Sequence, residues 1–259
     1  TNVNGNFFAC DDTCTHSGAS LSEGTLDRSR LAQVPIATLA GTKPTVYKQR
    51  IESDALDMSV AIVINESGSM GGRMEMAIAA SLVLGDALDA LNIPFTVMGH
   101  TGVAHDSLWA GYSEMDAKGL TGRYSRFGAS QIEWVKSFKE TWRGDNRKLM
   151  GALRPHWNTL DAHVVRTVTK MMCDTPQARK VVFMIDDGHP NSPISSAVND
   201  AEGLVSAVTD AEKAGVEMIG VGIQSSSVET FYERSAVIYN LNELPSALLK
   251  QFKSLFKTK

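Results

Sequence analysis

Short runs of apolar residues alternate with helical patterns along most of the chain. Three runs, at 60–64, 181–185 and 216–222, are rich in β-branched residues, which is typical of strands buried on both faces of a parallel sheet. A helical pattern over 73–91 separates the first run from a fourth, at 95–98, so this part of the chain predicts a parallel βαβ unit. We therefore predict a doubly wound, Rossmann-like α/β fold, with a mostly parallel central sheet flanked by helices.

Weaker patterns add further elements. Apolar residues at helical spacing predict three more helices, at 161–172, 201–214 and 244–256. Residues 237–239 are a candidate strand at the sheet edge. Within the glycine-containing segment 100–147, four apolar residues also recur at the spacing of one helix face, and we predict a helix through them. These four are Ile132, Val135, Phe138 and Trp142.

The first 54 residues have little sustained periodicity and are rich in Asn, Asp, Ser, Thr and Gly as far as Gly24. We expect residues 1–54 to form an N-terminal arm that packs on the main domain, and residues 55–259 to form that domain.

The composition narrows the function classes. With 43% hydrophobic and 21% charged residues, the 259-residue chain is typical of a globular protein with a real core. A net charge of −4 gives no electrostatic footprint for nucleic acid. No apolar run approaches the roughly 18 residues of a membrane span, and no basic-then-apolar leader is present. We therefore expect a cytoplasmic protein without a membrane or nucleic-acid partner.

Motifs for catalysis and cofactor binding are incomplete. Cys14-Thr15-His16 resembles half of a Rieske iron–sulfur motif, but Cys173 is not followed by the histidine that a second half needs. Ser67 lacks the preceding glycine of a nucleophile elbow, and no Gly-x-x-x-x-Gly-Lys loop for phosphates occurs. We assign no catalytic residue and no organic cofactor.

Oxygen-bearing side chains instead gather where parallel strands end. In an open parallel sheet, ligands bind at the carboxyl ends of the strands. Carboxylate, hydroxyl and amide oxygens are the ligands that Mg²⁺ and similar hard cations prefer. Candidate ligands follow the runs at 60–64 and 181–185 and precede the helix at 161–172. They are Asn65, Ser67, Ser69, Asn158, Asp161 and Asp187.

These residues resemble a known family. Asn65-x-Ser67-x-Ser69 is similar to the Asp-x-Ser-x-Ser motif of von Willebrand A domains, which carry a metal-ion-dependent adhesion site. Ile185-Asp186-Asp187-Gly188 resembles the later Ser/Thr-Asp-Gly motif of that family, and Asn158-Thr159-Leu160-Asp161 lies where the middle metal loop is expected. Over residues 23–256, the order of motifs resembles the C-terminal half of the T subunit of aerobic cobaltochelatase and its bacterial and phage relatives.

The resemblance implies Mg²⁺, Mn²⁺ or Ca²⁺ at the six candidate ligands. Asn65 stands where the family has Asp, which removes one negative charge close to the ion. We therefore expect the ion to be held weakly, or to be held fully only when a partner carboxylate completes its coordination. We expect the side chain of Glu66 to point away from Ser67.

The resemblance also implies a role. The chain would be an adaptor for a ring-forming AAA+ ATPase of the MoxR type, like the S subunit of cobaltochelatase, with no catalytic activity of its own. An alternative is a subunit of an ATP-dependent cobalt chelatase in cobalamin biosynthesis, with a large chelatase subunit as partner. A third is a structural component of a larger particle.

Overall fold

The computed structural model describes residues 2–3, 6–7, 57–102, 130–192, 197–240 and 242–243. By its internal contacts, the chain divides into two units, Thr1–Ile51 and Glu52–Lys259. In the first unit, the two-residue strands β1 (Asn2–Val3) and β2 (Asn6–Phe7) pair in antiparallel fashion. The predicted arm and the predicted helix at 244–256 lie almost wholly outside the described residues.

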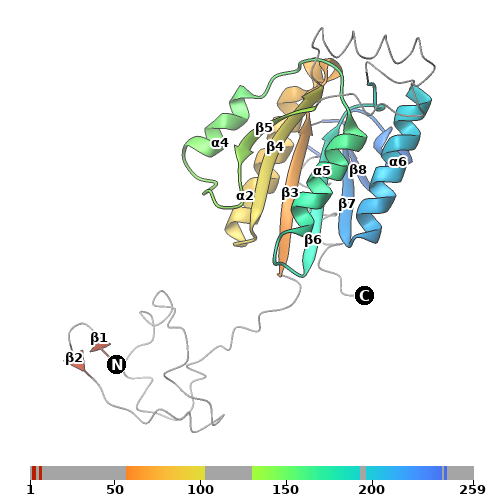
Figure 1. The fold of residues 1–259 in the computed structure, drawn as a ribbon. Coiled ribbons are helices and arrows are strands. Elements are labelled where there is room, and N and C mark those ends of the chain that lie inside the picture. The colour runs from red at the N-terminus through yellow and green to blue at the C-terminus, as the bar shows by residue number, and fades with distance from the viewer. Residues whose placement is uncertain are drawn as a thin grey trace. The chain divides into compact units, whose positions relative to one another are not determined.

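The second unit contains a six-stranded sheet with the order β5-β4-β3-β6-β7-β8 (Figure 1). Its strands are β3 (Met58–Asn65), β4 (Phe95–Gly102), β5 (Ser130–Lys136), β6 (Arg179–Asp186), β7 (Val216–Ile223) and β8 (Arg234–Ile238). All neighbouring pairs are parallel except β4 and β5. The predicted α/β fold with a mostly parallel sheet is therefore confirmed.

Helices cover both faces of this sheet (Figure 1). The long helices are α2 (Met74–Ala90), α5 (Asp161–Cys173) and α6 (Ala197–Lys213). The short ones are η3 (Gly68–Gly72), α4 (Asp145–Leu149), η4 (Met150–Ala152) and α7 (Val228–Phe231). Apolar residues of α2 pack on one face, whereas those of α5 and α6 pack on the other. No helix among the described residues is both long and apolar enough to span a membrane.

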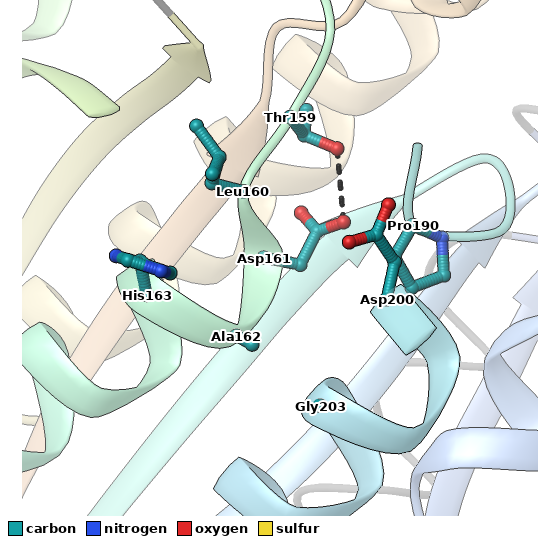
Figure 2. Close-up of a pocket in the computed structure, with 8 residues that line it drawn as sticks. All are labelled: Thr159, Leu160, Asp161, Ala162, His163, Pro190, Asp200 and Gly203. Carbon is teal, nitrogen blue, oxygen red and sulfur yellow. Dashed lines mark hydrogen bonds between the residues drawn. The ribbon is translucent and has the colours of Figure 1, made fainter. Parts of the chain in front are cut away.

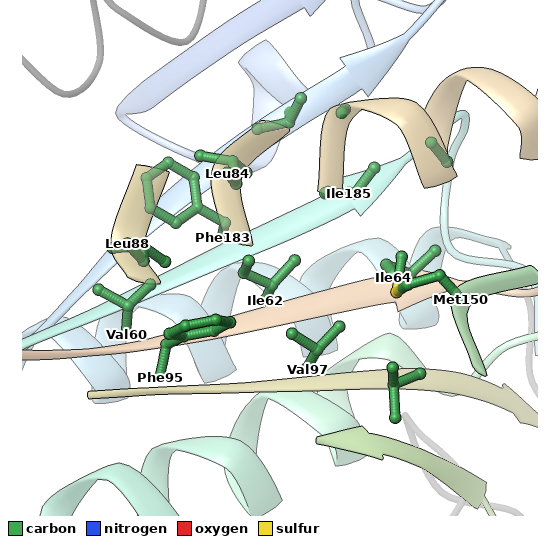
Figure 3. Packing of buried hydrophobic residues seen from close by; sticks show 14 of the residues in the cluster. Val60, Ile62, Ile64, Leu84, Leu88, Phe95, Val97, Met150, Phe183 and Ile185 are labelled. Atoms are coloured by element: carbon green, nitrogen blue, oxygen red, sulfur yellow. The ribbon is translucent and has the colours of Figure 1, made fainter. Parts of the chain in front are cut away.

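The inner strands are buried on both faces, which explains their uninterrupted apolar sequence. Ile62 and Ile64 of β3 face α2, where they pack with Leu84 (Figure 3). The intervening Ala61 and Val63 belong to the cluster on the opposite face. Complete burial of each large aliphatic side chain contributes about 1.5–3 kcal/mol to folding, so both faces stabilise the sheet.

The helix predicted through the middle segment is wrong. Ile132 lies in β5, an antiparallel edge strand, and the chain then turns before α4. The four apolar residues do not share a face: Val135 and Trp142 pack in the α2 cluster, whereas Ile132 and Phe138 pack against the other. The helical spacing therefore reflects side chains divided between the two sides of a sheet edge.

Candidate functional site

Asn65 closes the loop at the carboxyl end of β3. The amide nitrogen Nδ2 donates a hydrogen bond of 2.7 Å to Oδ1 of Asp186, at the end of the neighbouring strand β6. Its Oδ1 accepts a bond of 2.6 Å from the backbone N–H of Ser67. Because the amide both donates and accepts, the side chain joins two strand ends and shapes the loop that follows.

A chain of hydrogen bonds runs from this loop to Asp187. The Ser67 and Ser69 hydroxyl oxygens are 2.8 Å apart, and the Ser69 hydroxyl donates to Asp187 Oδ1 at 2.9 Å. The second oxygen, Asp187 Oδ2, accepts a bond of 2.6 Å from the Arg73 guanidinium, just before α2. Asp187 is 1% exposed and Arg73 is 33% exposed, so a cation of this chain reaches inward to the carboxylate.

Asp186 is a buried carboxylate that sequence reasoning left out of the ligand set. Its Oδ1 accepts bonds from Asn65, from the Asp187 backbone N–H at 2.7 Å and from the Gly188 N–H at 3.3 Å. Burial nevertheless raises the pKa of this carboxyl to about 6. In the family motif this position holds Ser or Thr, so a carboxylate absent at position 65 is present on the neighbouring strand. An Asp at a position where the family motif has Ser or Thr is the sequence signal that could have identified Asp186.

Asp161, the first residue of α5, brings a further carboxylate to this edge (Figure 2). Thr159 Oγ1 donates to Asp161 Oδ2 at 2.9 Å, while the buried Asp161 Oδ1 has no hydrogen-bond partner among the described residues. Burial, and then the charge of Asp186, raise the pKa of the Asp161 carboxyl well above its usual range. A pocket lies beside Asp161, and Asp200 of α6 also lines it.

His100 approaches the unpartnered oxygen without bonding to it. Its Nε2 is 3.8 Å from Asp161 Oδ1, and both side chains are fully buried. Neither ring nitrogen has a hydrogen-bond partner in the part of the chain that the structure describes. Burial lowers the pKa of the imidazole to about 4, so the ring is neutral at pH 7.

Asn158 is tied to the site through the backbone. Its carbonyl oxygen accepts the Gly102 N–H at 2.6 Å, and the adjacent Trp157 carbonyl accepts the Gly68 N–H at 2.8 Å. The structure thus joins Asn65, Ser67, Ser69 and Asp187 in one polar edge together with Asp186. Asp161 lies near enough for the charge of Asp186 to act on it. Asn158 lies in the loop before α5.

The polar edge has features for and against a divalent cation. The candidate metal ligands are all oxygens, as Mg²⁺ prefers. Asp161 Oδ1 accepts no hydrogen bond from the described residues. Among the described residues, however, Asp161, Asp186 and Asp187 do not bring three ligand atoms within 4.8 Å of one another. The residues therefore fit such an ion in type, and Asp187 is held by Arg73 instead.

Comparison with known proteins places these motifs in a family. The family described as "Cobalamin biosynthesis protein CobT VWA domain" matches residues 46–258. The uncharacterized protein YojO of Bacillus subtilis is 22% identical over 218 residues, which are 81% of this chain and 32% of YojO. The protein NorD of Brucella melitensis is 27% identical over 130 residues, 46% of this chain and 20% of NorD. The chain thus spans a third or less of these relatives.

Solved structures share the fold. The vWF domain of the type V pili tip protein Mfa5 from Porphyromonas gingivalis aligns with a TM-score of 0.53 at 11% identity. The alignment covers 78% of this chain and 97% of that domain. At this identity the likeness concerns the fold alone.

Proposed function

The chain belongs to the CobT von Willebrand A domain family, and from that premise we propose that it is a protein-binding module. In this proposal the polar edge binds a carboxylate of a partner protein through a divalent ion. The observation that carries it is the buried Asp161 Oδ1, which accepts no hydrogen bond from the described residues. The other candidate metal ligands at this edge are also oxygens. Leaving such an atom unpaired costs about 1–3 kcal/mol, which a bound ligand would offset.

The proposed ligands are the six residues that the sequence identifies: Asn65, Ser67, Ser69, Asn158, Asp161 and Asp187. Asp186 adds a neighbouring carboxylate to this set. When bound, Mg²⁺ would supply positive charge and a fixed geometry for one Asp or Glu of the partner. Asn65 keeps the loop closed, and Ser69 orients Asp187.

Arg73 makes this site conditional. Its guanidinium holds Asp187 Oδ2 at 2.6 Å, so an ion that uses this oxygen must displace it. A displaced Arg73, at the exposed rim, is free to pair with the carboxylate that the partner brings. We therefore propose weak binding of the ion by the chain alone and tighter binding when the partner is present.

The partner in this proposal is a ring-forming AAA+ ATPase of the MoxR type, which the resemblance to cobaltochelatase implies. In this role the chain is an adaptor between the ATPase and its target and performs no chemistry. The family description favours a second candidate, a subunit of an ATP-dependent cobalt chelatase in cobalamin biosynthesis, which would also bind a large chelatase subunit. The identity of the co-purified subunit distinguishes the two roles.

Capture of the ATPase tests the proposal. A MoxR-type ATPase would be co-expressed with wild type, with Asp187→Ala and with Asp174→Ala, an exposed control at the end of α5. We expect Mg²⁺-dependent capture by wild type and the control, and a loss of at least about tenfold for Asp187→Ala. Capture by Asp187→Ala that persists in EDTA would contradict the proposed site.

A further inference from the structure

Glu66 lies within the same loop as the polar edge but in a separate environment. The residue is fully buried between Asn65 and Ser67. Its Oε1 accepts the Arg154 backbone N–H at 3.1 Å, whereas its buried Oε2 has no hydrogen-bond partner within the described ranges. A buried carboxylate oxygen without a donor is unfavourable unless a ligand is present to neutralise it.

The glycine at position 99 makes room for this carboxylate. A Cβ atom at Gly99 would overlap Glu66 Oε2, so only glycine lets the carboxylate lie against β4. Gly99 pairs in register with Glu133 of the antiparallel strand β5. The register thus places a second acidic residue on the neighbouring strand beside the space that Glu66 fills.

A histidine completes the group. One ligand atom each from Glu66, Glu133 and His156 lies within 4.8 Å of the other two. His156 Nε2 is 3.8 Å from Glu133 Oε1, which also accepts a bond of 3.0 Å from Gln131. The Glu133 and His156 side chains are 32% and 43% exposed, so the group opens to solvent on one side and is buried on the other.

We propose that Glu66, Glu133 and His156 bind one divalent first-row transition-metal ion of the Zn²⁺ and Co²⁺ class. Two carboxylates and a neutral imidazole balance the charge of such an ion. The imidazole nitrogen favours Zn²⁺ or Co²⁺ over Mg²⁺, which prefers oxygen ligands alone. Three protein ligands leave a coordination position open, and the exposed Glu133 and His156 can close the remaining distance by rotation.

This site would also brace the loop that carries the polar edge. The Glu66 backbone N–H donates to the His100 carbonyl at 2.8 Å, and its carbonyl accepts the His156 N–H at 2.6 Å. An ion on the three side chains would therefore link the end of β3, the edge strand β5 and the loop before α5. The inference rests on these contacts alone and does not depend on the proposed adaptor function.

Titration with Co²⁺ tests the proposal, because its visible absorption reports nitrogen and oxygen ligation. The 259-residue chain would be titrated in excess Mg²⁺, which occupies oxygen-only sites, and Zn²⁺ would then displace Co²⁺. We expect one equivalent to bind to wild type, and Glu133→Gln and His156→Ala each to weaken binding by at least about tenfold. The matched control is the double variant Glu229→Gln, His189→Ala, because both residues are exposed and lie outside the group.

Two outcomes would overturn the proposal. One is equal Co²⁺ affinity in wild type and in both variants of the group. The other is loss of Co²⁺ binding in Asp187→Ala with retention in His156→Ala, which would place the ion at the polar edge. Glu133 and His156 are partly exposed, so their variants are expected to fold; a thermal unfolding midpoint raised by Zn²⁺ in wild type, but not in His156→Ala, is a second readout.

Discussion

Asn65 and Glu66 are adjacent in the chain, yet the polar side chains around Asn65 are hydrogen-bonded, whereas one carboxylate oxygen of Glu66 is not. On the Asn65 side, the amide, the two serines and Asp187 are hydrogen-bonded within the chain, and Arg73 already neutralises Asp187. On the Glu66 side, a buried carboxylate oxygen has no hydrogen-bond partner among the residues that the structure describes, although two other ligand groups lie close by. A metal ion at Asp187 must therefore replace the Arg73 guanidinium, whereas a metal ion at Glu66 would add a positive charge beside an unpaired carboxylate oxygen.

The difference predicts how each side responds to metal ions. An ion or partner at Asp187 competes with Arg73, so binding there is weakened by the ion pair it must break. No cation of the described residues is paired with Glu66, so an ion bound there would displace none of them. We therefore expect tighter binding on the Glu66 side when the chain is alone, and partner-dependent binding on the Asn65 side.

The largest effect is expected for Gly99→Ala, which removes the space on the Glu66 side. The new methyl group forces the Glu66 carboxylate to move, and overpacking of this kind costs about 1–3 kcal/mol. Urea unfolding should show this loss of stability, and Co²⁺ binding should disappear. Gly151→Ala is the control, because a Cβ there would meet no atom of the described residues within 4 Å. Equal stability and Co²⁺ affinity in the two variants would remove the basis for the comparison.

An effect on stability of similar size and opposite sign is expected for Asp161→Asn, whose side chain lies outside the Co²⁺ group. The amide removes a buried charge and should raise stability by about 1–3 kcal/mol without metal. Because the pKa of Asp161 is raised in the folded state, wild type is favoured at low pH and loses that advantage as pH rises through the folded pKa.

The gain of the Asp161→Asn variant should therefore be largest at neutral pH and vanish below the usual carboxyl pKa of 3.8. Urea unfolding of both proteins across this pH range measures it. A gain in stability that does not change with pH would show that folding does not destabilise the ionised form of Asp161.

The smallest effect on stability is expected for Arg73→Ala. The ion pair is partly exposed on the Arg73 side, so its loss should cost no more than about 1 kcal/mol. The freed Asp187 should, however, bind Mg²⁺ about tenfold more tightly, which calorimetric titration can measure. Arg143→Ala, which removes an exposed ion pair with Asp89, is the control. Unchanged or weaker Mg²⁺ binding would show that Arg73 does not compete with the ion.

The sequence predicted the fold where local pattern and burial agree. The runs at 60–64 and 181–185 are continuous because strands covered on both faces need apolar residues at every position. The edge strand β5 was missed because Val135 and Ile132 serve opposite faces, and their spacing imitates a helix.

For the candidate site too, only features encoded within one segment of the sequence were predicted. The loop from Asn65 to Ser69 and the Asp187 motif are contiguous in sequence, and they were identified by pattern. The role of Arg73 and the group around Glu66 depend on contacts between distant segments, above all on the register of Gly99 with Glu133. No periodicity within one segment encodes such a register.

The central claim is that the polar edge holds a divalent ion through Asp187, and a Mn²⁺ titration tests it most directly. Free Mn²⁺ is measured by its paramagnetic resonance signal in the His156→Ala variant, which lacks the second site, and in the His156→Ala, Asp187→Ala double variant. The account predicts saturable binding to the first protein and binding at least about tenfold weaker to the second. Indistinguishable curves would contradict it.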